Sequence, residues 1–219
     1  MDPSRALEQI RQCGIITVLR GDFPPDKAIA VCEVLLDAGL NVVELTHNSP
    51  DWRTALPAVR DAFGDDLLVG MGTVLNPAQV REALDTGAEF LVSPILDPPS
   101  VSTAHAAGVL MAPGAATPSE AVQAANLGCR LIKFFPAGAL GVNYFRAMRG
   151  PLNDLNFTCN GHMHVGNVGE FLQAGAAACG VAGDGLAGNG SRPLPEIHAI
   201  ARDLAAIVRE VRGAEKVGR

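Results

Sequence analysis

A short unit recurs along this chain and constrains its fold more than any other feature. In each unit a helix-like segment ends at a glycine and a short apolar strand follows; the glycines are Gly39, Gly87, Gly108, Gly128 and Gly175. Glycine readily adopts the left-handed conformation that ends many helices. The glycines at 87, 108 and 128 are 21 and 20 residues apart, and the intervals 39–87 and 128–175 span 48 and 47 residues. Each of the two long intervals therefore has room for two units.

Three further strands complete the pattern. Leu67–Met71 and Asn156–Cys159 fit the long intervals, and Ile15–Arg20 forms an initial strand, which makes eight βα units. Apolar rather than alternating strands are typical of a parallel sheet covered by helices. We predict a (β/α)8 TIM barrel that forms a single domain over residues 1–219, with a short N-terminal helix. An open doubly wound sheet is the alternative, and the regular spacing favours the closed barrel.

The end of the chain has a different pattern. Residues 199–212 have the apolar periodicity of an amphipathic helix that closes the domain, and a charged tail follows. We expect this tail to fray, because terminal residues without packing partners are poorly ordered.

Composition narrows the class of protein. The chain has 219 residues, 48% of them hydrophobic and 18% charged, which suits one well-packed soluble domain. A net charge of −6 without a long basic run argues against nucleic acid as a partner. Five scattered cysteines without a C-x-x-C pair are typical of reduced thiols in a cytoplasm. Because we find neither a leader-like N-terminus nor a membrane-length apolar run, we expect a cytoplasmic location and no membrane partner.

One lysine lies in the middle of an apolar strand. Lys133 interrupts the run 130–136, which reads RLIKFFP. An ammonium without a partner is costly to bury, so the group tends to lose its proton. A neutral lysine amine can attack a ketone and form a Schiff base. On this run alone, a lysine that extends its ammonium to water or to a carboxylate explains the pattern equally well.

A second charge, Glu44, lies inside the strand at 41–45. If the strand faces that carry Glu44 and Lys133 both point into the barrel, an acid and an amine converge there. A structural ion pair is the alternative, although buried pairs stabilise a fold inefficiently. The functional interpretation also explains Gly70, Gly72 and Gly114, small residues that would leave space beside the two charges. In a barrel the active site lies where the strands end, and polar residues follow most of the predicted strands.

Three motifs resemble those of the KHG/KDPG aldolase family. They are IKFFPA at 132–137, GMGTVLNP at 70–77 and PGAATPSE at 113–120, and they occur in the family's order. The resemblance runs from near Ile15 to the end of the chain. The stretch LRG at 19–21 and the NSPDW motif at 48–52 are most similar to the phosphogalactonate branch, because the phosphogluconate branch would place an arginine where Asn48 stands.

The resemblance implies a class I aldolase on a (β/α)8 barrel, commonly a homotrimer, that needs no metal or other cofactor. Such an enzyme cleaves a 2-keto-3-deoxy sugar acid or a 4-hydroxy-2-oxo acid to pyruvate and an aldehyde. Lys133 matches the Schiff-base lysine, Glu44 matches the general acid/base, and Arg20 and Thr73 match groups that hold the pyruvate carboxylate. The remaining residues that we expect to bind substrate are Asn48, Pro94, Gly114, Phe135, Asn160, Gly161, His162 and Asp184.

The chain departs from the family in its two phosphate-binding turns. The first usually resembles TGG followed by Ile or Val, and here 160–164 reads NGHMH; the second usually resembles GGS or GS, and here 182–185 reads AGDG. His162 stands where a glycine would bring its N–H to the phosphate. Asp184 aligns with the serine, and a carboxylate repels a phosphate dianion. We hypothesise that the substrate ends in a neutral or polyhydroxyl group that His162 and Asp184 can bind.

Several alternatives remain open at this point. Phosphate binding by a protonated His162 would retain the phosphogalactonate or phosphogluconate substrate of the family. His162, His164 and Asp184 could hold a metal ion, as in a metal-dependent aldolase, although a Schiff-base mechanism needs none. A barrel that binds a 2-oxo acid without catalysis is the reading from a different functional class.

Overall fold

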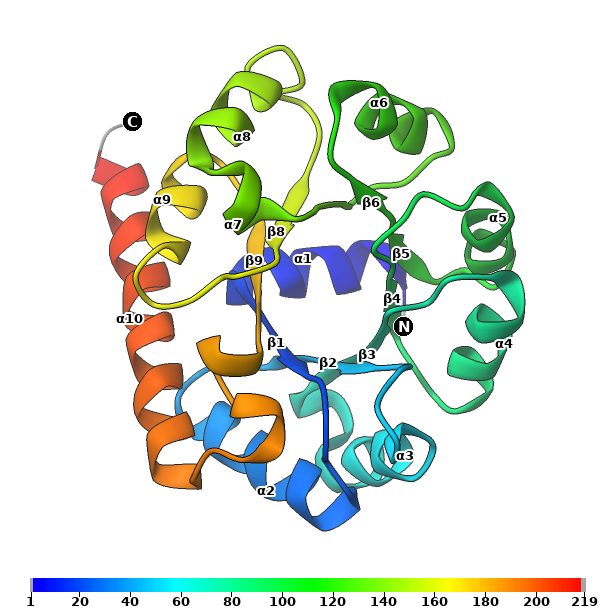
Figure 1. Ribbon diagram of the computed structural model, residues 1–219, viewed down its shortest axis with the longest axis vertical. Coiled ribbons are helices and arrows are strands. Elements are labelled where there is room, and N and C mark those ends of the chain that lie inside the picture. Colours follow the sequence, from blue (N-terminus) through cyan, green and yellow to red (C-terminus); the bar gives the residue numbers. More distant parts are fainter. Residues whose placement is uncertain (1, 218–219) are drawn as a thin grey trace.

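A ring of parallel strands surrounded by helices makes up the computed structural model, which describes residues 2–217 (Figure 1). The strands are β1 Ile15–Leu19, β2 Val42–Thr46, β3 Leu68–Gly72, β4 Phe90–Val92, β5 Leu110–Ala112, β6 Gly114–Ala115, β7 Ile132–Phe134, β8 Phe157–Asn160 and β9 Ala178–Ala182. The arrangement confirms the predicted TIM barrel, and it excludes the open doubly wound sheet.

Most of the helices lie around the outside of the ring, and the first helix precedes the first strand. They are α1 Pro3–Cys13, α2 Pro25–Asp37, α3 Trp52–Phe63, α4 Pro77–Asp85, α5 Pro98–Ala106, α6 Pro118–Asn126, α7 Ala137–Leu140, α8 Val142–Arg149, α9 Val168–Gln173 and α10 Leu194–Val217, with the 3-10 turns η1 Gly64–Asp66, η2 Gly183–Gly185 and η3 Gly188–Gly190. Among residues 2–217, none of the helices is both long enough and apolar enough to span a membrane.

The fifth strand is divided in two, which accounts for nine strands where eight were predicted. The sheet order is β5-β4-β3-β2-β1-β9-β8-β7-β6, and only Pro113 separates its two outer members in the chain. Proline has no backbone N–H and interrupts a ladder. Its carbonyl still accepts a hydrogen bond from the N–H of Lys133 at 2.8 Å. The ring therefore closes through the chain itself at Pro113.

Local signals explain where the helices begin and end. The side chains of Asp2, Asn76, Asp97 and Thr117 accept hydrogen bonds from the first backbone N–H groups of their helices, and proline occupies the first helical position after each. At the other ends, the five glycines of the repeat all have φ between 69° and 103°, the left-handed conformation predicted for them. The repeat in the sequence is therefore a repeat of helix caps.

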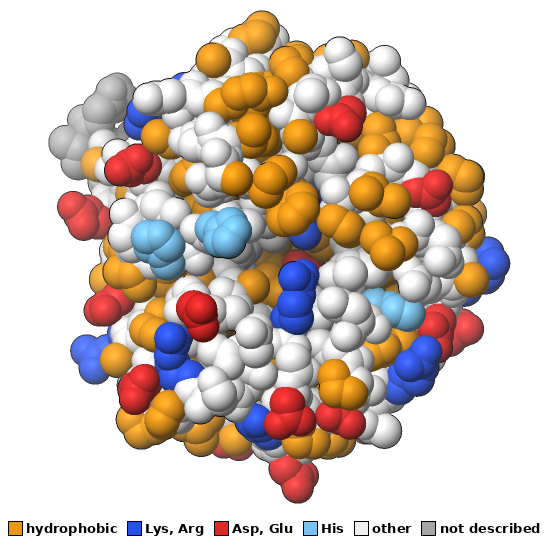
Figure 2. All heavy atoms as spheres, in the orientation of Figure 1, with side chains coloured by type: hydrophobic (Ala, Val, Ile, Leu, Met, Phe, Trp, Pro, Cys, Tyr) orange, Lys and Arg blue, Asp and Glu red, His pale blue; other side chains and the backbone are white. Residues whose placement is uncertain are grey.

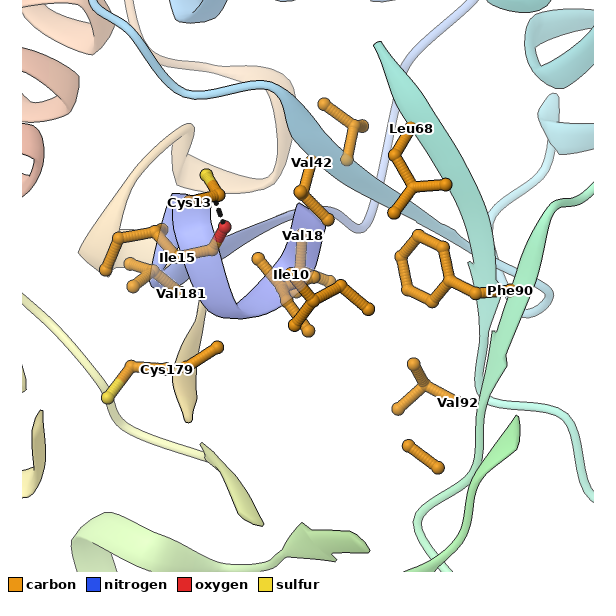
Figure 3. Packing of buried hydrophobic residues seen from close by; sticks show 14 of the residues in the cluster. Ile10, Cys13, Ile15, Val18, Val42, Leu68, Phe90, Val92, Cys179 and Val181 are labelled. Atoms are coloured by element: carbon orange, nitrogen blue, oxygen red, sulfur yellow. Dashed lines mark hydrogen bonds between the residues drawn. The ribbon is translucent and has the colours of Figure 1, made fainter. Parts of the chain in front are cut away.

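Two helices complete the barrel. Helix α1 crosses the ring at the end where the strands begin, and Figure 3 shows Ile10 of this helix directed into the interior near Val18. Helix α10 begins at Leu194 and continues to Val217, so it is longer than the predicted segment 199–212. Residues 213–217, which we expected to fray, are helical because most of them are good helix formers. The rest of the tail lies outside the described residues.

Close packing inside the barrel depends on a glycine. Phe90 points into the interior from β4 (Figure 3), and a Cβ atom at Gly70 would lie 2.4 Å from its ring. Gly70 was expected to leave room beside the two buried charges. The structure shows instead that Phe90 fills this space.

A pair of glycine-to-alanine variants tests this packing. Gly70→Ala should lower the free energy of unfolding by about 1–3 kcal/mol, because the new methyl group overpacks against Phe90. Gly213→Ala, at an exposed position of α10 where the structure describes no contact of the added Cβ within 4 Å beyond the adjacent helix backbone, should raise it by up to about 1 kcal/mol. Urea unfolding measures both values. Equal effects of the two variants would contradict the packing argument.

Candidate active site

A cavity of about 660 Å³ opens at the end of the barrel where the strands finish. The lining residues come from β1, β2, β7, β8 and β9 and from the segments that follow them. Figure 2 shows this face with a hollow at its centre, in which acidic and basic side chains are visible, and with histidine side chains beside it. This is the end of the barrel at which we expected the site.

Glu44 and Lys133 meet in this cavity. Glu44 lies on β2 and is 1% exposed, and Lys133 lies on β7 and is 4% exposed. Among the buried polar atoms of residues whose side chains the structure describes, only Oε2 of Glu44 lacks a hydrogen-bond partner. The same residues show no ion pair between Glu44 and Lys133. This arrangement disfavours a structural ion pair and leaves a buried carboxylate oxygen free for a ligand.

Burial shifts the pKa of both groups toward the neutral form. Loss of water raises the pKa of the Glu44 carboxyl, and the positive charges of Lys133 and Arg20 oppose this only in part. Loss of water also lowers the pKa of the Lys133 amine; Glu44 opposes this shift and Arg20 adds to it. A lowered pKa increases the fraction of neutral, nucleophilic amine near neutral pH. Lys133 also lies 5.0 Å from the ring centroid of Phe135, which forms one wall of the cavity.

Two glycines on neighbouring strands make room for the polar side chains. A Cβ atom at Gly72 would lie 1.7 Å from Oε1 of Glu44, so the glutamate lies across β3 at that point. A Cβ atom at Gly180 would lie 1.9 Å from Nδ2 of Asn160, so the asparagine lies across β9 in the same way. Oδ1 of Asn160 accepts a hydrogen bond from the hydroxyl of Thr158 at 3.0 Å. Because Gly72 and Gly180 have no side chains, Glu44 and Asn160 have room to lie at the cavity.

The two residues expected to hold a carboxylate are brought together. Arg20 follows β1 and lines the cavity, and its guanidinium donates a hydrogen bond to Oγ1 of Thr73 at 3.3 Å. Thr73 has φ of 61°, an uncommon conformation for a β-branched residue. Backbone strain of this kind often occurs at functional sites.

The far end of the cavity is lined by turns. Gly161, His162 and Asp184 lie there, where we expected them, and His164 lies beside them. His162 has φ of 55°, the left-handed backbone conformation that a glycine would adopt easily. His164 is engaged locally, since its Nδ1 accepts a hydrogen bond from the N–H of Gly166 at 3.0 Å. In the described part of the chain, no group of three or more His, Cys, Asp or Glu side chains is placed to hold a metal ion.

Comparison with known proteins places this geometry in a family. The model of the KDPG and KHG aldolase family matches residues 7–197. The 2-dehydro-3-deoxy-6-phosphogalactonate aldolase of Escherichia coli K12 is 34% identical, covering 91% of this chain and 95% of its own. A probable 2-dehydro-3-deoxy-6-phosphogalactonate aldolase of Rhizobium meliloti is 37% identical, covering 82% of both chains. The native KDPGal structure has 32% identity and a TM-score of 0.85, covering 91% of this chain and 96% of its own.

The chain belongs to the KDPG and KHG aldolase family. This agrees with the three sequence motifs, all of which lie within the matched residues. The family also fits the position of the site, because the cavity contains an amine and a carboxylate that are both deprived of water.

Four residues that we expected at the site do not line the cavity. Thr73 reaches it only through its hydrogen bond to Arg20. Asn48 is exposed on the turn after β2. Pro94 and Gly114 pack against each other instead, since a Cβ atom at Gly114 would lie 2.2 Å from the Pro94 carbonyl oxygen. The residue types predicted a polar or small lining, but the directions of the loops depend on tertiary contacts.

Other lining residues were missed, and Asn189 is the most informative of them. It lies in η3, far along the chain from the residues it meets, and has φ of 53°. Its neighbours Gly188 and Gly190 signalled a turn, but a turn pattern does not reveal which part of the barrel it covers. The remaining missed residues are Val18, Pro136, Met163, His164, Gly180, Ala182, Gly183 and Gly185, of which His164 was considered only as a metal ligand.

The raised pKa of Glu44 predicts a pH-dependent gain in stability for Glu44→Gln. Below the ordinary carboxyl pKa both side chains are neutral, and the melting temperatures (Tm) should be similar. Above the raised pKa the wild type carries a buried charge and the variant does not, so the variant should have the higher Tm, and the difference should grow as the pH rises between the ordinary and the raised pKa. Tm measured from pH 4 to pH 9 gives the difference.

Glu89→Gln is the matched control. Glu89 is also buried, but it accepts a hydrogen bond from the N–H of Val69 and forms an ion pair of 2.6 Å with Arg60. Its replacement should lower the stability at pH 7 by about 1–3 kcal/mol, because the partner charge is left unpaired. A loss of stability in Glu44→Gln as large as in this control would contradict the interpretation of Glu44.

Proposed function

We propose that this protein is a class I aldolase that cleaves a 2-keto-3-deoxy sugar acid or a 4-hydroxy-2-oxo acid to pyruvate and an aldehyde. The observation that carries the proposal is the pair of water-excluded groups, Lys133 and Glu44, in one cavity. Family membership supports the reaction class, and the named relatives are aldolases of 2-dehydro-3-deoxy sugar acid phosphates.

The first stage of the reaction uses Lys133. Its neutral amine attacks the C2 carbonyl of the substrate to give a carbinolamine, which loses water to form a protonated imine. Glu44 can supply the proton that the departing hydroxide needs, because burial favours its protonated form. The Glu44 carboxylate that results is the base for the next stage.

In the second stage the imine accepts electrons. Glu44 takes the proton of the C4 hydroxyl, the C3–C4 bond breaks, and the aldehyde leaves with the C4 carbon while the electron pair moves into the imine to form an enamine. Glu44 then returns this proton to C3 to give the protonated pyruvate imine. Water hydrolyses the imine to pyruvate and the Lys133 amine, and the proton that this step releases returns to the Glu44 carboxylate. Arg20, with Thr73 behind it, fits the role of holding the substrate carboxylate and so fixing C2 near the amine.

Borohydride trapping tests the role of Lys133. Reduction in the presence of pyruvate should attach a pyruvate-derived group to Lys133 and abolish aldolase activity; mass spectrometry of peptides locates the adduct. Lys133→Arg keeps the positive charge but cannot form the imine, so it should give no adduct and lower kcat by at least about 10³-fold. A wild-type protein that binds pyruvate without an adduct would support the alternative of a non-catalytic barrel.

The far end of the cavity supports a substrate without a phosphate group. A phosphate dianion is usually bound by backbone N–H groups and positive charge. Here the end carries the Asp184 carboxylate and the imidazoles of His162 and His164. Arg192 donates hydrogen bonds to the backbone carbonyls of Asp184 and Leu186. These groups suit a neutral, hydroxylated end, which can both donate and accept hydrogen bonds.

Cleavage rates of paired substrates test this proposal. The wild type should have a kcat/KM at least about 10-fold higher for 2-dehydro-3-deoxygalactonate than for its 6-phosphate, since a repulsive charge contact costs more than about 1.4 kcal/mol. His162→Gly suits the backbone at φ 55° and should shift the ratio toward the phosphate. His105→Ala, on α5, should leave the ratio unchanged. A strong wild-type preference for the phosphate would reject the proposal and favour a phosphogalactonate or phosphogluconate aldolase.

We also propose that the protein is a homotrimer and that it lies in the cytoplasm. The family resemblance suggests a homotrimer, and exposed apolar side chains such as Ile95 and Leu75, at 46% and 42%, are compatible with an interface between subunits. The five cysteines are free and buried, which fits the reduced thiols of a cytoplasm.

A further inference from the structure

The residue that faces the substrate carboxylate lies on a loop held from two sides. Arg20 is the first residue after β1, and β1 lies between β2 and β9 in the sheet. A long, exposed arginine side chain has many conformations, and a loop that moves would add to them. The position of the guanidinium therefore depends on what holds the backbone beside it.

On the β2 side, the contact is the hydroxyl of Ser49. The N–H of Gly21 donates a hydrogen bond to Oγ of Ser49 at 3.0 Å. Oγ of Ser49 is also 2.8 Å from Oγ1 of Thr46, which is fully buried at the end of β2, and the N–H of Ser49 donates to the Thr46 carbonyl at 2.9 Å. Ser49 is thus fixed to the barrel and connects it to the residue after Arg20. It does not line the cavity.

On the β9 side, the contact is the backbone of Asn189. Its carbonyl accepts a hydrogen bond from the N–H of Asp22 at 3.2 Å. The approach is close, since a Cβ atom at Gly21 would lie 2.4 Å from the Asn189 carbonyl oxygen, and one at Gly190 would lie 2.3 Å from the Asp22 carbonyl oxygen. Gly21 has φ of 115°, which a residue with a side chain rarely adopts.

We propose that Ser49 is a positioning residue for carboxylate binding: its hydroxyl, opposite the Asn189 carbonyl, holds the 20–22 loop so that Arg20 faces the cavity. The N–H groups of two consecutive residues, Gly21 and Asp22, bind neighbours on opposite sides, so the loop is clamped across β1. The proposal rests on the proposed function only in that Arg20 binds the carboxylate of a 2-oxo acid. Ser49 itself touches neither the substrate nor Lys133 in this scheme.

Ser49 should affect the binding of pyruvate and leave the chemical step at Lys133 unchanged. Loss of the Ser49 hydroxyl should free the loop, so that pyruvate binding has to order it again. Once pyruvate is bound, Lys133 and Glu44 are unchanged on their strands. The concentration of pyruvate for half-maximal borohydride trapping should therefore rise, while the trapping rate at saturation should stay close to that of the wild type.

The experiment compares three serine variants of the full chain, with pyruvate as the probe. Ser49→Ala should raise the half-saturating concentration about 5- to 15-fold, the loss expected for one hydrogen bond to a partly buried N–H. Ser49→Thr keeps a hydroxyl and should stay within about 2-fold of the wild type. Ser100→Ala removes a buried hydroxyl that binds Asp97 at 2.5 Å outside the cavity, so it should lower Tm without changing the half-saturating concentration.

Hydrogen exchange gives a second readout that does not require catalysis. The amide of Gly21 should exchange at least about 10-fold faster in Ser49→Ala than in the wild type, and should be unchanged in Ser100→Ala. An unchanged half-saturating concentration in Ser49→Ala, or an equal loss in Ser100→Ala, would overturn the proposal. If the wild type forms no pyruvate adduct, the proposed function fails instead, and Gly21 exchange alone decides whether Ser49 holds the loop.

Discussion

The structure depends on keeping two ionisable groups away from water inside a barrel. Glu44 and Lys133 lie on β2 and β7, which are far apart in the chain, and the closed sheet brings both into one cavity. Burial of each charge costs free energy, and the burial of the surrounding apolar strands offsets this cost. The same loss of water favours a neutral amine and a carboxyl group that can both give and take a proton.

The rest of the site depends on the room that glycines leave for polar side chains and on backbone contacts that hold the loop of Arg20. Gly72 lets Glu44 lie across β3, and Gly180 lets Asn160 lie across β9, so the missing side chains matter as much as the polar ones. Arg20 is the opposite case, a long side chain whose position depends on backbone contacts made by its neighbours. Rigid strands therefore carry the groups assigned to chemistry, and a clamped loop carries the group assigned to recognition.

Much of the fold and part of the site could be predicted from the sequence, for local physical reasons. Glycine caps and apolar strands are short-range signals, so the repeat predicted the barrel, and a charge within an apolar strand identified Lys133 and Glu44. The two-residue strand β6 has no pattern of its own and was missed. Asn48 was expected to line the cavity and does not, and Asn189 was missed, because the direction of a loop is set by distant contacts, such as that of the Asn189 carbonyl with Asp22. The three sequence motifs indicated the family, but they carry no information about these loop contacts.

The break at Pro113 has a consequence for association between molecules. A sheet of strands in linear order has two edges whose free N–H and C=O groups can recruit a strand from another chain. Here the two edge strands, β5 and β6, are joined by a single residue, so the described sheet offers no edge along its length where a foreign strand could add. We therefore expect contacts between copies of this protein to be made by side chains of helices and loops, and Lys133, whose N–H is bonded to the Pro113 carbonyl, lies beside this junction.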